Sequence, residues 1–227
     1  MNQVVINSTT IGIVISVLGY ELGMLLKRKF KLAVFNPLLI SIIFVIICLG
    51  IFNVDYEKSA QYLGYLLTPA TVCLAIPLYQ QIRLLKENIW AIFLGILSGV
   101  LTSLGCILAF ALLFGFNHKE YVTLLPKSIT TAIGMGVSEE LGGYVTITVA
   151  VIIITGVLGN ILADVVCKIF RITNPVAKGI GIGTASHAIG TAKAMEMGEI
   201  EGAMSSLSIV IAGILTMIGA SVFANFL

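Results

Sequence analysis

The chain has 227 residues, of which 58% are hydrophobic and only 11% are charged, and its formal net charge is +2. Soluble domains carry about 25% charged residues, so this composition excludes a water-soluble globule and also a disordered chain. One bilayer crossing takes about 20 apolar residues, which leaves room for about seven crossings with short loops. We therefore expect an all-α polytopic membrane protein, and the small net charge gives no indication of nucleic-acid binding.

The first half of the chain contains four predicted crossings. The basic cluster at residues 27–31 follows the first of them, so the positive-inside rule places this cluster in the cytoplasm and the N-terminus outside. Pro69 and Pro77 fall within the third crossing, which we therefore expect not to form one regular helix. The four predicted crossings are residues 4–26, 36–52, 61–81 and 89–116.

The stretch 121–143 is too polar for a helix that faces lipid. A full crossing would place the basic residues Lys168, Arg171 and Lys178 outside, whereas a re-entrant path would place them in the cytoplasm. We favour the re-entrant path, in which irregular backbone must line protein or a water-filled cavity. Further crossings are predicted at residues 144–169, 176–195 and 203–227, which puts the C-terminus in the cytoplasm.

Two pairs of segments resemble each other at a nearly constant offset. Residues 71–77 resemble residues 184–190, and residues 99–105 resemble residues 213–219. By the charge rule the two halves of this repeat run in opposite directions across the membrane. Inverted repeats with interrupted helices are typical of secondary transporters, which bind substrate near the bilayer midplane. We therefore treat the chain as one domain, 1–227, with halves at about 1–115 and 116–227.

The first candidate site follows Pro126, where one cation and three hydroxyls lie within five residues: Lys127, Ser128, Thr130 and Thr131. A lysine inside a membrane is costly, and together with hydroxyls and helix N-terminal amides it would suit a small carboxylate. In the alternative interpretation, Lys127 reaches the outer interface and the hydroxyls bond their own helix.

The second candidate site is the helix face that we predict for Thr184, His187 and Thr191, which are spaced at i, i+3 and i+7. His187 could bind the carboxylate or carry a coupled proton, or it could be a helix-packing histidine. Thr71 is the counterpart from the other repeat. Glu139 is a second candidate for proton coupling, and the alternative is a solvated turn.

The sequence gives no indication of a cofactor, a metal or an enzyme. The four cysteines lie singly in apolar stretches, and two histidines are too few for a metal cage. No Ser-His-Asp order and no HExxH motif occur in a usable setting.

The sequence resembles the LrgB/CidB family over nearly its whole length. Two departures stand out, because the family commonly has glycine where Thr68 stands and proline where Ala132 stands. The second departure puts a proline-fixed break after the threonine pair in doubt. The matching stretches are residues 36–39, 67–79, 127–131, 154–156 and 181–192.

This resemblance implies a multi-pass protein of the bacterial cell membrane with the fold of the bile acid symporters. It implies either uptake or exchange of small monocarboxylates such as pyruvate, glycolate or glycerate, or holin-like or antiholin-like control of murein hydrolase export and autolysis. A smaller LrgA/CidA-type membrane protein is the implied partner, and a homo-dimer or hetero-oligomer is expected. We favour the carrier, because polar residues gather at helix breaks and no span carries a sustained polar stripe.

Overall fold

The computed structural model describes residues 9–30, 35–52 and 54–227, and the regular secondary structure in these ranges is helical. The chain divides into two compact units, Met1–Cys73 and Leu74–Leu227. The second unit contains most of the polar residues singled out above, and it is therefore described in more detail.

The first unit consists of α2 (Ile11–Phe30), α3 (Pro37–Phe52) and most of α4 (Tyr56–Gln80). Helix α3 begins at its proline, where the missing N–H costs no hydrogen bond. The prediction that the prolines interrupt the third crossing is wrong, because α4 runs as one helix from Tyr56 to Gln80. A proline removes one rung of the helical ladder, and membrane helices tolerate this loss when the remaining rungs are intact.

Three helices of the second unit are long and apolar enough to cross a bilayer. They are α6 (Ile89–Phe114), α9 (Val145–Ile169) and α11 (Glu199–Phe223), of which the last is extended to Phe226 by a 3-10 turn, η1 (Ala224–Phe226). The 26 residues of α6 span about 39 Å at 1.5 Å per residue, more than the hydrocarbon core of a bilayer. Other helices in the described ranges are shorter or less apolar, so the expected total of about seven crossings stays a prediction.

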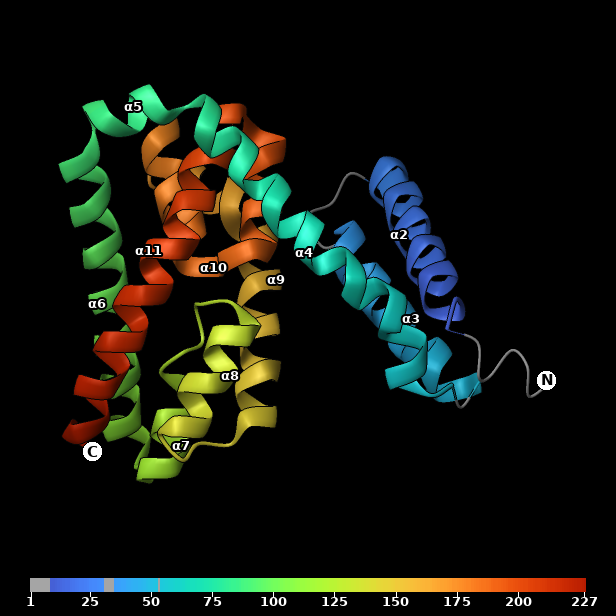
Figure 1. Cartoon of the computed structure of the whole chain (residues 1–227), viewed down its shortest axis with the longest axis horizontal. Coiled ribbons are helices and arrows are strands. Elements are labelled where there is room, and N and C mark those ends of the chain that lie inside the picture. The colour runs from blue at the N-terminus through green and yellow to red at the C-terminus, as the bar shows by residue number, and fades with distance from the viewer. Residues whose placement is uncertain (1–8, 31–34, 53) are drawn as a thin grey trace. The chain divides into compact units, whose positions relative to one another are not determined.

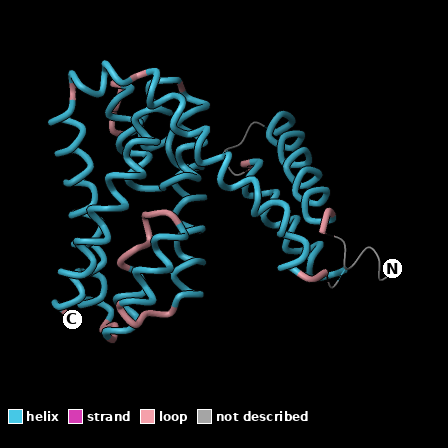
Figure 2. Tube along the Cα trace, viewed as in Figure 1, coloured by secondary structure: helices cyan, strands magenta, loops and turns pink. Residues whose placement is uncertain are grey.

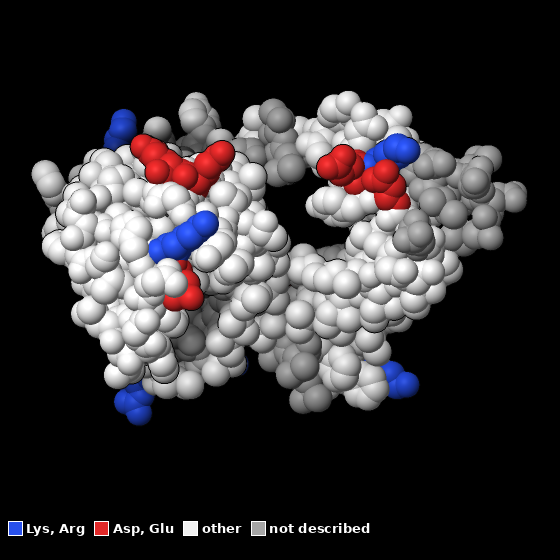
Figure 3. Space-filling view, turned by 90° about the horizontal axis from the view of Figure 1, so that it is seen from below, with Lys and Arg blue, Asp and Glu red and all other residues white. Residues whose placement is uncertain are grey.

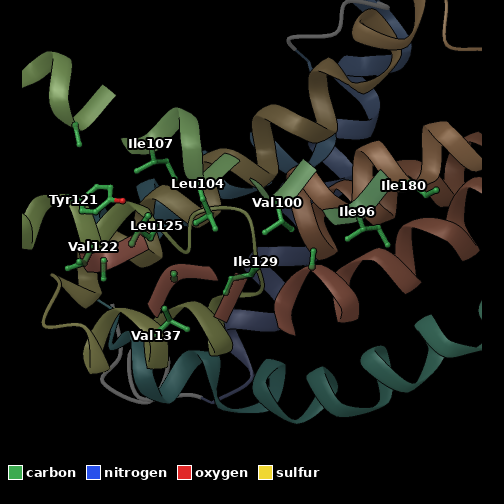
Figure 4. Packing of buried hydrophobic residues seen from close by; sticks show 14 of the residues in the cluster. Ile96, Val100, Leu104, Ile107, Tyr121, Val122, Leu125, Ile129, Val137 and Ile180 are labelled. Carbon is green, nitrogen blue, oxygen red and sulfur yellow. The ribbon is translucent and has the colours of Figure 1, made fainter. Parts of the chain in front are cut away.

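The core of this unit forms along one face of α6. Its buried side chains, from Ile92 to Ala111, recur every three or four residues and so share one face. Figure 4 shows the α6 residues Ile96, Val100 and Leu104 in a row. The core continues into the segment that follows α6, where Tyr121 and Leu125 are buried. This packing fixes the position of the polar 121–143 stretch.

The 121–143 stretch enters the unit and returns to the end from which it started. It forms two short helices, α7 (His118–Leu124) and α8 (Thr131–Glu140), and neither is long enough to cross. Thr123 at the end of α7 lies beside the start of α9, since its Oγ1 accepts a hydrogen bond from the Tyr144 N–H at 2.8 Å. Thr148 of α9 donates to the Thr123 carbonyl oxygen at 2.9 Å. This geometry agrees with the re-entrant path.

Helix α10 (Pro175–Met197) is also a hairpin, because its backbone breaks at Ser186 and His187. His187 has a φ of 43°, a left-handed conformation that ends the first half-helix and reverses the chain. Both halves pack on the same residue of α11: the Cα of Gly183 faces the Ser205 backbone, and Thr191 Oγ1 lies 2.7 Å from Ser205 Oγ. The prediction that residues 176–195 form a crossing is therefore wrong.

The two hairpins enter the second unit from opposite ends. In Figure 1, α7 and α8 occupy the lower part of the unit and α10 the upper part. The loop that joins α7 to α8, drawn in pink in Figure 2, lies at mid-height, below the α10 hairpin. The upper end also carries α5 (Ile82–Glu87) and the α9–α10 connection. The hairpin tips therefore meet near the middle of the unit.

The hairpin in α10 changes which end of the unit holds the C-terminus. His118 Nδ1 lies 3.1 Å from the Leu227 carbonyl oxygen, and Tyr121 Oη donates to the Phe223 carbonyl oxygen at 3.0 Å. The predicted crossings place the loop at His118 and the C-terminus on opposite sides of the membrane, and this prediction is wrong, because both lie at the lower end. The cause is that α10 does not cross, so α11 starts at the end where α9 stops.

Charged groups are few and isolated on the surface. In the face shown in Figure 3, small groups of charged side chains are separated by large uncharged areas. Basic side chains concentrate at the upper end of the second unit, namely Arg83, Lys86, Lys168, Arg171 and Lys178. The positive-inside rule predicts that this end faces the cytoplasm.

We predict that Asn117→Cys and Asn225→Cys react from one side of the membrane, whereas Arg171→Cys and Glu199→Cys react from the other. The four native cysteines would first be replaced by alanine. A membrane-impermeant maleimide would be applied to right-side-out and inverted vesicles. Labelling of positions 225 and 171 from the same side would contradict the α10 hairpin.

We also predict that Gly183→Ala lowers stability, because a Cβ at this position would overlap the backbone of Ser205. The expected cost is about 1–3 kcal/mol, typical of overpacking. Gly105→Ala is the matched control, since a Cβ there meets nothing within 4 Å, and alanine has the higher helix propensity. Melting in detergent, followed by size-exclusion chromatography, measures both, and equal melting temperatures would refute the close packing.

Candidate functional site

A cavity of about 300 Å³ lies where the tips of the two hairpins meet α6. Its polar side chains come from three separate parts of the chain, so tertiary packing alone brings them together. The lining residues are Gly95, Gly99, Thr102, Ser103 and Cys106 of α6, Lys127 and Ser128 of the α7–α8 loop, and Ile180, Gly181, Thr184 and Ala185 of α10.

Lys127 is the cation of this cavity. Its side chain is partly buried, and its Nζ donates to Ser128 Oγ at 2.8 Å. Ser128 Oγ in turn lies 3.5 Å from Ser103 Oγ on α6. Within the described ranges no carboxylate lies within 4.0 Å of Lys127 Nζ. A cation that is held in apolar surroundings without a counter-ion favours the binding of an anion.

Thr184 supplies a hydroxyl that has no partner. Its side chain is 8% exposed, and Oγ1 is the one buried side-chain polar atom in the described part of the chain that makes no hydrogen bond. Buried hydroxyls are almost always satisfied, because an unpaired one costs about 1–3 kcal/mol. A ligand in the cavity could supply the missing partner, since Thr184 lines it together with Lys127.

Thr130 and Thr131 lie at the N-terminus of α8, and neither is among the residues that line the cavity. The side chain of Thr130 occupies the N-cap position without bonding the helix N–H groups. The structure therefore places them close in sequence to Lys127 but does not bring their side chains into the same cavity.

The prediction that Thr184, His187 and Thr191 share one helix face is wrong. The break at Ser186 and His187 divides them, and each faces a different neighbour. His187 is 3% exposed and its Nε2 lies 3.0 Å from the Ile152 carbonyl oxygen of α9. Thr191 donates to the His187 carbonyl oxygen at 2.9 Å and meets α11. Neither His187 nor Thr191 lines the cavity, and the contacts of both stabilise the hairpin.

Glu139 lies apart from the cavity, because it is exposed near the C-terminus of α8, at the lower end of the second unit. Thr71 belongs to the part of α4 in the first unit, and its side chain lies outside the described residues. Their proposed roles stay predictions.

The sequence analysis missed the contribution of α6. Thr102, Ser103 and Cys106 lie on the face of α6 that also carries Gly95 and Gly99. These five small or polar residues recur at i, i+4, i+7, i+8 and i+11, the spacing of one helical stripe. That stripe was readable from the sequence, but small residues in a membrane helix more often mark packing than a site.

A second hollow of about 380 Å³ lies between α9 and α10. It shares Lys127, Gly181 and Ala185 with the first cavity, so the two lie on either side of the first half of α10. Its wall is mostly apolar and includes Leu158, Leu162, Ala163, Val166 and Ile182, with Lys178 at the upper end.

The comparisons with known proteins identify the family of the chain. The LrgB-like family model matches residues 16–226, nearly the whole chain.

The chain belongs to the LrgB-like family.

Two curated relatives illustrate the similarity of this LrgB-like chain to named proteins. It is 38% identical over 209 residues to the holin-like protein CidB of Staphylococcus aureus strain Mu50, and the match covers 91% of each chain. It is 34% identical over 220 residues to the antiholin-like protein LrgB of Bacillus mycoides strain KBAB4, covering 95% of this chain and 96% of the relative. No solved structure matches the chain.

These results confirm the family resemblance and the assignment to a membrane protein. The names of the relatives describe holin-like and antiholin-like proteins, so they favour that predicted function over the carrier. They do not specify a substrate.

We predict that Thr191→Val destabilises the LrgB-like chain by about 1–3 kcal/mol, because it leaves the buried hydroxyl of Ser205 without its partner. Both side chains are fully buried and lie 2.7 Å apart. Ser221→Ala, which removes an exposed hydroxyl bonded to its own helix, is the control and should change little. Unfolding of purified protein in detergent measures the difference in stability. Equal stability of the two variants would contradict a stabilising hydrogen bond between Thr191 and Ser205.

Proposed function

We propose that this LrgB-like protein is a secondary transporter of small monocarboxylates across the bacterial cell membrane. One observation carries the proposal: a lysine without a carboxylate partner, Lys127, shares a cavity with the unpaired hydroxyl of Thr184 at the point where the two hairpins meet. Burying a polar group inside a membrane protein costs free energy, and such groups therefore mark substrate paths. The cavity volume of about 300 Å³ accommodates a small organic anion.

The arrangement of hairpins supports alternating access. Helix α6 runs downward and is followed by a hairpin from the lower end, whereas α9 runs upward and is followed by a hairpin from the upper end (Figure 1). The returning half-helices begin with similar sequences, Thr-Ala-Ile-Gly at 131–134 and His-Ala-Ile-Gly at 187–190. We infer an inverted repeat between these segments, and the repeat expected between residues 71–77 and 184–190 stays a prediction.

Each polar group of the cavity would have a role in binding. Lys127 would neutralise the carboxylate, and its three N–H donors leave capacity beyond the bond to Ser128. Thr184 would donate to or accept from a second oxygen of the substrate. Ser103 and Ser128 would replace the water that the anion loses on binding. His187 packs against α9, so any coupled proton that it carries would act on the hairpin rather than on the substrate.

A second candidate is a holin-like or antiholin-like activity, which the names of the relatives favour. In this function the chain would assemble into a homo-oligomer, or with a small LrgA/CidA-type membrane protein, and would control the export of murein hydrolases. A lesion formed by such an assembly would pass solutes without selecting carboxylates.

Reconstituted proteoliposomes separate the two candidates. Counterflow of labelled pyruvate and glycolate, measured with and without the small partner, tests the carrier. Release of a trapped neutral dye from the same vesicles tests the lesion. Saturable carboxylate exchange without dye release supports the carrier, whereas dye release without selective exchange supports the holin-like activity.

For the carrier, we predict that Lys127→Gln lowers the rate of counterflow roughly tenfold or more, because the loss of a hydrogen bond to a charged group costs about 1.5–3 kcal/mol. Lys119→Gln is the matched control. Lys119 lies eight positions earlier, and its Nζ sits over the Tyr144 ring at 4.3 Å, outside the cavity. An undiminished rate in Lys127→Gln would remove Lys127 from the binding site.

A further inference from the structure

We propose that Lys127 also binds aliphatic monocarboxylates, whose hydrocarbon tail occupies the hollow between α9 and α10. This proposal rests on the carboxylate site proposed above and extends it to a second class of ligand. Its basis is that Lys127 lines two hollows of opposite character. One offers hydroxyls and the other offers a hydrocarbon wall.

The two hollows meet at Lys127 because α10 has almost no side chains there. Gly181 and Ala185, one helical turn apart, line both of them. A larger side chain at either position would separate the hollow on the α6 side from the hollow on the α9 side. An anion held at Lys127 can therefore direct its remaining atoms to either side of α10.

The wall of the α9–α10 hollow suits a hydrocarbon chain. Leu158, Leu162 and Val166 project from α9 at i, i+4 and i+8, and they form one apolar stripe. These three side chains are about half exposed in the absence of an occupant, at 50%, 45% and 42%. Moving methylene groups of a dissolved ligand from water to such a wall is favourable by roughly 25 cal/mol per Å² of the ligand's apolar surface that leaves water.

The charges that line the hollow select an anion. Lys127 lies at its inner end and Lys178 at its upper end, and no acidic side chain of the described residues lines it. From Ala185 to Lys178 the helix rises about 10 Å at 1.5 Å per residue, which leaves room for several methylenes. The carboxylate would pass Lys178 and reach Lys127, while the tail lies along α9.

The experiment measures how affinity depends on tail length. Labelled acetate, butyrate and hexanoate would be dialysed to equilibrium against wild-type protein in lipid nanodiscs. Nanodiscs that contain Lys127→Gln serve as the blank for partitioning into lipid. Affinity for the wild type should rise roughly threefold to fourfold with each added methylene, the factor expected for burial of a CH₂ group.

Val166→Trp fills the hollow and should remove this gain with tail length. Val165→Trp is the matched control, because Val165 is similarly exposed, at 41%, but does not line the hollow. Leu162→Trp provides a second filled variant should Val166→Trp fail to fold. Equal affinity for acetate and hexanoate in the wild type, or an unchanged gain in both filled variants, would overturn the proposal.

The outcome is distinguishable from that of the proposed function. Pyruvate exchange without a gain from tail length would support the carrier and refute this inference. A gain from tail length that depends on Lys127, in vesicles that do not exchange pyruvate, would support this inference and refute the carrier.

Discussion

The structure depends on one constraint: away from water, every break in a helix exposes polar backbone that needs a partner. The α10 hairpin meets this requirement locally. Asn160 of α9 donates to the Ile189 carbonyl oxygen at 2.8 Å, and Ser186 donates to the Ile182 carbonyl oxygen at 2.7 Å. Two groups at the hairpin tips remain without such compensation, the hydroxyl of Thr184 and the charge of Lys127. Their common cavity is therefore the place where a polar ligand contributes most.

The lower hairpin is closed by a similar network. Thr148 Oγ1 contacts Ser138 Oγ at 2.7 Å as well as the Thr123 carbonyl oxygen, and all three residues are buried. This network binds the two ends of the segment 118–144 together, so the loop at Lys127 is held from below. A loop held in this way keeps its charged side chain at a fixed depth, which a binding site for a small anion requires.

The names of the relatives and the geometry of the cavity concern different properties. CidB and LrgB are named as holin-like and antiholin-like proteins, whereas the cavity concerns what one chain can bind. An assembled lesion needs a continuous polar path, whereas the polar groups of the second unit divide between one open cavity and the hydrogen-bonded networks of the two hairpins.

Composition alone determined that the protein is helical and lies in a membrane, because so few charges cannot cover a soluble surface. The sequence also singled out Lys127, Ser128 and Thr184 as candidates, since unusual polar residues stand out in apolar sequence, and the structure places all three in the lining of one cavity. It did not reveal that Ser186 and His187 reverse the chain, because a glycine- and alanine-rich stretch has the same local pattern in a crossing and in a hairpin. Contacts with α9 and α11, such as that of His187 with Ile152, stabilise the reversal. Only tertiary packing thus decided the position of the C-terminus and the share of α6 in the site.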